Sequence, residues 1–237
     1  MNGPHDQDID RRVAAGFGGR FYGVYPARVV DVVDPEGQGR VRVELPWSPD
    51  PDDDSYEAWA RLATLMAGGD RGSWFVPDED DEVLITFEAG NPRRPYVVGA
   101  LWNGQDAPPE QMDGSGRNNK KVLRSRNGVQ VTLDDTDGRE TLKLETPGGQ
   151  TVTLKDGPGV IEARDSNGNS VKMESSGVTV NSSSKVTINA GASAEVNAGT
   201  VTVNAGMSTF SGVVQASTVI TNSVVSASYT PGAGNIW

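Results

Sequence analysis

Residues 178–208 read VTVNSSSK, VTINAGAS, AEVNAGT and VTVNAGMS when the sequence is divided at each return of its pattern. Within each of these words the apolar residues stand two positions apart, so they lie on the same face of a β-strand. The words are seven or eight residues long, which leaves room for a strand of about five residues and a corner of about three. A strand this short cannot bury its narrow apolar face by itself.

Two arrangements would cover that face. One chain could wind into a thin solenoid, in which successive turns bury one another. Alternatively, three identical chains could wind around a common axis, each giving one strand in turn to each side. The apolar residues are small and uniform, which favours three chains because a shared axis has room for little else. Such a region buries its apolar surface only on assembly, so no folded monomer of it is expected.

We therefore predict an intertwined homotrimeric β-helix over residues 128–237. The residues expected on its axis are Val178, Val180, Val186, Ile188, Val196, Val201 and Val203.

The charge and the composition of the chain exclude several classes of protein. The 237 residues carry a formal net charge of -11, which argues against nucleic-acid binding and against docking on an anionic lipid surface. The absence of cysteine rules out disulfides and thiolate metal sites. The first residues, MNGPHDQDIDRR, contain no apolar run, so we predict no signal peptide at this end.

The N-terminal part has a different composition, with most of the aromatic residues and many charges. Stretches such as DEVLITFEAG (81–90) and RPYVVGALWNG (94–104) have the pattern of strands. AWARLATLMA (58–67) fits either a helix or a strand, and a strand is favoured because the following GGDRGSWFVP fits a β-bulge and a loop. About five strands without a clear helix indicate a small Greek-key barrel. We place an N-terminal arm at 1–20, the barrel at 21–107 and a linker at 108–127.

Three hairpins are predicted after the linker. Alternating strands flank glycine-containing turns in VQVTLDDTDGRETLKLE (129–145), QTVTLKDGPGVIEARD (150–165) and SVKMESSGVTVN (170–181). Corresponding strands start about twenty residues apart, which is the signature of an internal repeat.

Several of these stretches resemble one known family. ARVVDVVDPEGQGRVRVELPW (27–47) and WFVPDEDDEVLITFEAGNPRRPYVVGALWNG (74–104) are similar to the central spike proteins of contractile tails, namely phage baseplate assembly protein V and the VgrG proteins of type VI secretion. The later hairpins resemble the same family in the same order. The resemblance implies an all-β protein with an N-terminal OB-fold barrel followed by the trimeric β-helix, or needle.

The function implied by this resemblance is structural, and no enzyme activity is expected. The protein would be the central spike of a contractile injection machine, docking on the baseplate hub and piercing the target envelope. Whether the machine is a phage tail, a tailocin or an extracellular injection system stays open. The expected location is the baseplate of a virion or injection particle, after assembly in the bacterial cytoplasm.

The resemblance also implies partners. Besides the homotrimer these are a trimeric hub on a separate chain, because only about 20 residues precede the barrel, and a PAAR-like tip protein at the C-terminal apex. Tyr229 and Trp237 are the residues expected to dock that tip. Tube proteins and cargo effectors are further candidates, and contact with the target membrane would be transient.

Residues that suggest chemistry have plainer interpretations. The acidic runs DPDDD (50–54) and DEDDE (78–82) fit either a divalent metal site or solvated loops, and the loops are favoured because no metal-binding spacing is present. His5 is the only histidine and lies in the N-terminal arm. We therefore expect no catalytic residue, no metal and no cofactor.

Two other functions remain as alternatives. One is a trimeric β-helical tailspike or adhesion fibre that binds surface carbohydrate, which would need carboxylate pairs on a groove. The other is an OB-fold protein that stacks nucleotides on its tryptophans, for which the candidates are Trp47, Trp59, Trp74 and Trp102.

Overall fold

A computed structural model describes residues 19–49 and 55–228 of the chain. The chain divides into two units, one that ends at Lys185 and one that begins at Val186. The first unit contains a closed barrel and an open sheet, both made of strands. The expected all-β class and N-terminal barrel are confirmed.

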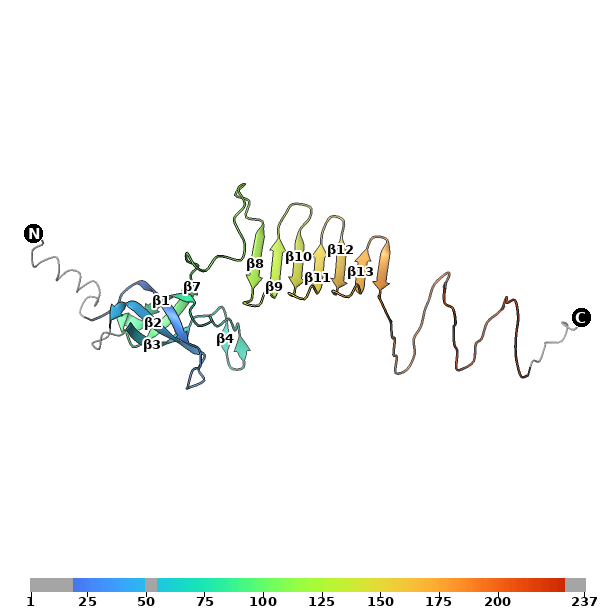
Figure 1. Ribbon diagram of the computed structural model, residues 1–237, viewed down its shortest axis with the longest axis horizontal. Helices are drawn as coiled ribbons and strands as arrows, with labels where there is room; N and C mark the ends of the chain where they lie inside the picture. The colour runs from blue at the N-terminus through green and yellow to red at the C-terminus, as the bar shows by residue number, and fades with distance from the viewer. Residues whose placement is uncertain (1–18, 50–54, 229–237) are drawn as a thin grey trace, which may run out of the picture. The chain divides into compact units, whose positions relative to one another are not determined.

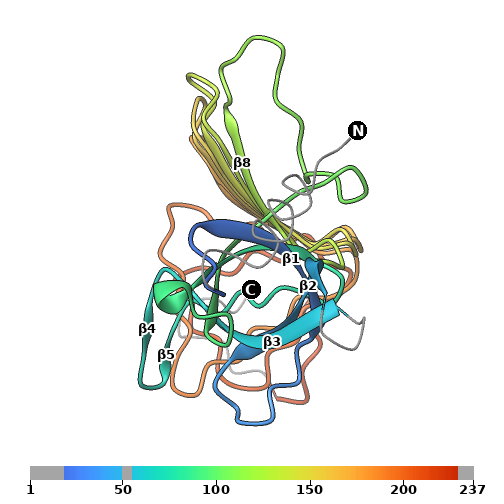
Figure 2. The same cartoon turned by 90° about the vertical axis from the view of Figure 1, so that its left-hand side faces the viewer.

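Five strands close the barrel in the order β1-β2-β3-β7-β6; its ring is seen end-on in Figure 2. The strands are β1 (Val24–Asp31), β2 (Arg40–Pro49), β3 (Ser55–Leu62), β6 (Glu82–Phe87) and β7 (Pro95–Ala100). Only the β3–β7 pair is parallel. Closure leaves no free strand edge in the ring, so its main-chain hydrogen bonds are satisfied within one chain.

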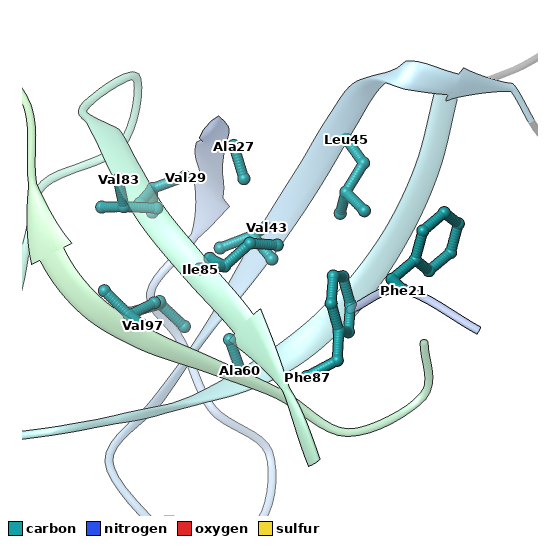
Figure 3. Packing of buried hydrophobic residues seen from close by; sticks show 11 residues of the cluster. Phe21, Ala27, Val29, Val43, Leu45, Ala60, Val83, Ile85, Phe87 and Val97 are labelled. Carbon is teal, nitrogen blue, oxygen red and sulfur yellow. The ribbon is translucent and has the colours of Figure 1, made fainter. Parts of the chain in front are cut away.

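The inward side chains of these strands form the core that Figure 3 shows. Alternate residues of β2 and β6 point inward, as period-two geometry requires, and Val43, Leu45 and Ile85 have no exposed surface. The full set of buried apolar residues is Phe21, Ala27, Val29, Val41, Val43, Leu45, Ala60, Val83, Ile85, Phe87 and Val97.

The segment expected as one strand at 58–67 is divided. β3 ends at Leu62, and a separate hairpin of β4 (Ala67–Gly68) and β5 (Arg71–Gly72) follows. Figure 2 shows this hairpin standing outside the ring of barrel strands. A short 3₁₀ turn at Glu88–Gly90 joins β6 to β7.

Seven strands form the open sheet, and each pairs with the next in an antiparallel meander (Figure 1). They are β8 (Lys120–Arg124), β9 (Gln130–Asp134), β10 (Thr141–Glu145), β11 (Thr151–Lys155), β12 (Val160–Arg164), β13 (Ser170–Glu174) and β14 (Gly177–Asn181). The three predicted hairpins are confirmed as β9–β10, β11–β12 and β13–β14.

The meander differs in two respects from the winding expected from residue 128 onward. Its first strand, β8, lies within the stretch expected as a linker at 108–127. Hairpins also pair with each other within the chain, through β10–β11 and β12–β13. The inner strands β9 to β13 therefore satisfy their ladders without a second chain, because the turns are short enough for each strand to return beside the last, while β8 and β14 each keep one open edge. Winding between chains stays a prediction for the residues after Asn181, where β14 ends.

Glycines set the turns at both ends of this sheet. At one end Gly128, Gly149 and Gly168 repeat nearly the same backbone angle, with φ of 86°, 85° and 87°, in the region that glycine adopts most readily. At the other end the turns stack so tightly that a Cβ on Gly157 would lie 2.2 Å from the Gly138 carbonyl oxygen. The repeat seen in the sequence is thus a repeat of turn geometry.

The second unit has no core among its described residues. Residues 186–228 contain no strand and no buried side chain. Among all described residues, no helix combines the length and apolar character that crossing a membrane requires.

Candidate assembly surface

One face of the seven-stranded sheet is covered by apolar side chains. The cross-strand register aligns them in two rows. The first row runs through Leu123, Val131, Leu144, Val152, Ala163, Val171 and Val180. The second runs through Leu133, Leu142, Leu154, Ile161, Met173 and Val178.

These rows have no second layer of protein over them in the single chain. Their leucine, isoleucine and methionine side chains, and most of their valines, are between 37% and 68% exposed. A sheet stabilises itself by burying one face against another element, and an apolar surface of this extent on a soluble protein marks an interaction site. The two rows are the candidate assembly surface.

The opposite face of the same sheet is polar. Its middle row is Thr132, Lys143, Thr153, Glu162, Lys172 and Thr179. Ion pairs join Lys172 to Glu174 at 2.6 Å, Arg164 to Glu162 at 2.7 Å, and Lys143 to Glu145. This face is suited to water, so the two faces have distinct roles.

The axis residues predicted from the sequence fall into two groups. Val178 and Val180 end the two apolar rows, and they lie on the same face as the rest. The other five, which belong to the second unit, are between 59% and 81% exposed: Val186, Ile188, Val196, Val201 and Val203. Their place on an axis stays a prediction. Tyr229 and Trp237 lie outside the described residues.

Most of the apolar surface was absent from the predicted set, which began at Val178. Leu144 and Val152, for example, stand in the same alternation as Val178 and Val180. The sequence signal for these residues was present, because apolar residues alternate in all three predicted hairpins. A prediction that β10 also pairs with β11 would have joined those positions into two rows.

The residues considered for chemistry occupy ordinary structural positions where they are described. In the 78–82 run, Asp80 pairs with Arg28 at 3.1 Å and Asp78 with Arg126 at 2.9 Å. Over the described ranges, no group of acidic or histidine side chains could hold a metal ion. The 50–54 run and His5 fall outside those ranges.

Two of the four tryptophans considered as stacking platforms have structural contacts in the barrel. Trp47 stacks on Tyr25, with ring centroids 4.7 Å apart, and its indole N–H donates to the Pro26 carbonyl at 2.8 Å. The Trp59 ring lies near the guanidinium groups of Arg40 and Arg42. Trp74 and Trp102 are mostly exposed.

A carboxylate secures the turn between β1 and β2. Asp34 accepts hydrogen bonds from the Arg40 side chain and from the backbone N–H groups of Glu36, Gln38 and Arg40. The hydrogen bond from the Arg40 guanidinium, supported by those backbone donors, holds the pKa of Asp34 well below its usual range. The group therefore stabilises the folded barrel in its charged form.

Two family models match the chain, the first over the barrel and the second over most of the open sheet and part of the second unit. The "Type VI secretion system/phage-baseplate injector OB domain" matches residues 25–102, which span the barrel. The "Phage baseplate V C-terminal trimerisation domain" matches residues 141–209, which include most of the apolar rows and all seven predicted axis residues. The chain belongs to the phage baseplate V and VgrG spike family.

Relatives within this family are type VI secretion spike proteins. The chain is 25% identical over 138 residues to spike protein VgrG1b of Pseudomonas aeruginosa and 26% identical over 129 residues to spike protein VgrG3 of Vibrio cholerae. It is also 26% identical over 147 residues to the actin cross-linking toxin VgrG1 of Vibrio cholerae.

These alignments cover about half of this chain but only a small part of each relative. They span 52%, 49% and 56% of the chain, against 19%, 12% and 13% of the three spike-family relatives. The chain therefore spans less than a fifth of the length of each of these relatives, and most of each larger protein has no counterpart in the alignment.

Proposed function

We propose that this protein is the structural central spike of a contractile injection machine and that it works as a homotrimer. The observation that carries the proposal is the two-sided sheet, apolar on one face and ion-paired on the other, whose last five strands lie in the region that matches a trimerisation domain. Three copies with their apolar rows facing inward would bury all three faces around one axis. The polar faces would then meet water.

The same reasoning extends to the second unit. Its apolar residues are exposed in the single chain, and its words are too short to bury them. Three chains wound together would bring Val186, Ile188, Val201 and their equivalents onto a dry axis. The hydrogen bonds that the separate chain lacks would form between chains, which would make the rod stiff.

A stiff rod with a polar exterior suits mechanical penetration. Axial load would pass along backbone ladders, and the polar outside would leave no apolar patch to adhere to the envelope. In this proposal the role is structural rather than enzymatic, and the activity named for the toxin relative is not extended to this chain, because the alignment covers 13% of that protein.

The proposed partners correspond to the two ends of the spike. The barrel end would dock on a trimeric hub protein of the baseplate, and the C-terminal end, with Tyr229 and Trp237, would receive a PAAR-like tip protein. Tube proteins and cargo effectors would join in the assembled particle, and contact with the target membrane would be brief.

The oligomeric state tests the core of this proposal. Light scattering of the full chain should give about three times 25.1 kDa. Leu144→Asp should abolish the trimer, because it places three carboxylates in an apolar interface. Lys143→Asp changes the adjacent residue on the polar face, so it serves as the matched control and should remain trimeric. A monomeric wild type, or a trimeric Leu144→Asp, would overturn the proposal.

Binding to the machine tests the second part. The trimer should capture a baseplate hub protein when the two are co-expressed, and electron microscopy of the complex should show a rod projecting from the hub. A trimer that forms rods but binds no baseplate protein, and instead binds bacterial surface polysaccharide, would favour the adhesion-fibre alternative.

A further inference from the structure

A second apolar surface lies on the barrel, away from its core. It belongs to the β4–β5 hairpin and the residues that flank it, 64–75, here called the knob. Leu65 is 98% exposed, Trp74 76% and Phe75 75%, and Met66 is exposed as well. Four large apolar side chains gathered in twelve residues mark an interaction site rather than scattered surface residues.

The knob is an ordered element. The Ser73 N–H donates to the Met66 carbonyl at 2.9 Å, and the Thr64 hydroxyl donates to the Ser73 carbonyl at 2.8 Å. The Trp74 ring rests against the β1–β2 turn, since a Cβ on Gly39 would lie 3.1 Å from it. Hydrogen bonds thus hold the apolar side chains outward, where a partner would meet them.

The same unit also carries an open groove of about 1090 Å³. Its apolar lining includes Val32, Leu101 and Trp102, which follow barrel strands, and Val122 and Leu123 of β8. Trp102 is 70% exposed, so the groove is not filled by its own chain.

Charge distinguishes the groove from the knob. Five carboxylates line the groove, four of them from the 78–82 run, together with Arg124 and Arg126. Glu79 makes no ion pair with any described residue, whereas Asp78 pairs with Arg126 at 2.9 Å. On the knob, Arg71 follows Asp70 of the turn and makes no ion pair within the described part of the chain. The Arg71 guanidinium can pair with the carboxylates, which outnumber the arginines of the groove.

The groove is continuous with the candidate assembly surface. Leu123 lines the groove, and it is also the first residue of the first apolar row, opposite Val131. A neighbouring copy that covers the apolar rows would therefore reach the groove at Leu123. This makes another copy of the same chain the natural occupant.

We propose that the knob of one protomer inserts into the groove of the next, closing a ring of three barrels. The inference rests on the proposed trimer. A knob and a groove at different places on one chain make a head-to-tail contact, and such contacts close when repeated around a three-fold axis. The trimerised sheets would hold the barrels at high effective concentration, so a modest knob contact is enough to order them.

Chemical cross-linking tests this contact, because the chain contains no cysteine. The full-length double variant Met66→Cys, Leu101→Cys, treated with a short bis-maleimide, should give a covalent trimer on a denaturing gel. A matched pair, Met66→Cys with Thr179→Cys on the polar face of β14, should give no covalent trimer. Co-expressed single variants, Met66→Cys with Leu101→Cys, should give covalent dimers only, since each contact joins one knob to one groove.

The outcomes separate this inference from the trimer itself. If the chain is a trimer by light scattering but the cross-linker gives only single chains linked internally, the knob folds into its own groove. If the trimer gives no cross-link at all, the knob does not reach the groove of a neighbouring copy. Either result overturns the ring. A monomer by light scattering would instead overturn the proposed function.

A variant of the knob itself provides the confirming measurement. Phe75→Asp, added to the Met66→Cys, Leu101→Cys chain, should leave the trimer mass unchanged while cross-linking falls to the level of the Thr179 control. Undiminished cross-linking would mean that the apolar side chains of the knob do not make the contact.

Discussion

The barrel and the open sheet are built from the same alternating pattern, yet only the barrel has a core. In β2 and β6, inward valines, leucines and isoleucines have no exposed surface, whereas the corresponding residues of β10 and β11 are about 40% exposed. The difference is closure. A sheet that curls into a ring covers its own apolar face, and a flat meander leaves that face for other copies. Stability should therefore be intramolecular in one region and depend on assembly in the other.

Ile188→Asp should have the largest effect, and only on the assembly-dependent region. Three carboxylates on a dry axis would cost several kcal/mol each, so the trimer should be lost in light scattering while the barrel keeps its tryptophan fluorescence. Thr187→Asp, on the other face of the same word, is the control and should remain trimeric. A normal trimer from Ile188→Asp would show that the inward face is misassigned.

Ile85→Ala should destabilise the barrel alone and leave the assembly unchanged. Removing a fully buried isoleucine side chain costs about 2–5 kcal/mol, which chemical denaturation followed by tryptophan fluorescence will measure. The trimer mass should not change. Val98→Ala, at a half-exposed position of β7, should cost far less, and equal losses for the two variants would contradict the assigned core.

Gly157→Ala should have a smaller effect, confined to the turns of the sheet. Its φ of 49° is strained for alanine, and the new Cβ would meet the Gly138 carbonyl oxygen at 2.2 Å. The loss of stability should be about 1–3 kcal/mol in thermal unfolding of the trimer. At Gly159 nothing lies within 4 Å of a Cβ, so Gly159→Ala is the matched control and should be near neutral.

The smallest effect is expected in the dependence of barrel stability on pH. The pKa of Asp34 is lowered in the folded barrel by the Arg40 hydrogen bond, so its charged form stabilises the fold above the unfolded pKa of about 4. That contribution disappears as the pH falls through the lower folded pKa. Asp34→Asn should reduce barrel stability at pH 7 and flatten its dependence on pH below about 4, measured by denaturation at each pH. If the stability of Asp34→Asn depends on pH in the same way as that of the wild type, the Asp34 carboxylate does not stabilise the barrel.

Sequence reasoning reached the barrel, the three hairpins and the family because these depend on local signals. DEVLITFEAG alternates cleanly, and glycines mark each turn. It missed that the hairpins join into one sheet within the chain, because the pairing of β10 with β11 depends on the turn TPGGQ (146–150), which separates two predicted hairpins in the sequence. It also took the 58–67 segment as one strand, since Leu65 and Met66 look like a continuing strand when their exposure is unknown.

The apolar rows of the candidate assembly surface were also beyond sequence reasoning, because they depend on how the strands pair. Alternation predicts that Leu144 and Val152 share a face, but only the register places them opposite each other. The knob had no sequence signal that separated it from a barrel loop. Leu65, Trp74 and Phe75 are unremarkable as residue types, and only their exposure on an ordered hairpin singles them out.

The meander has a consequence for how the spike is made. Each of its strands pairs with the one synthesised just before it, and contacts this close along the sequence form quickly. Every chain can therefore pair these strands before it meets its partners, although the sheet becomes stable only once its apolar face is covered. In the proposed trimer, sheets that pack together would align the three chains at β14, so the winding beyond it would start in register. Slippage by one residue, which would turn the apolar positions outward, would be prevented where the winding begins.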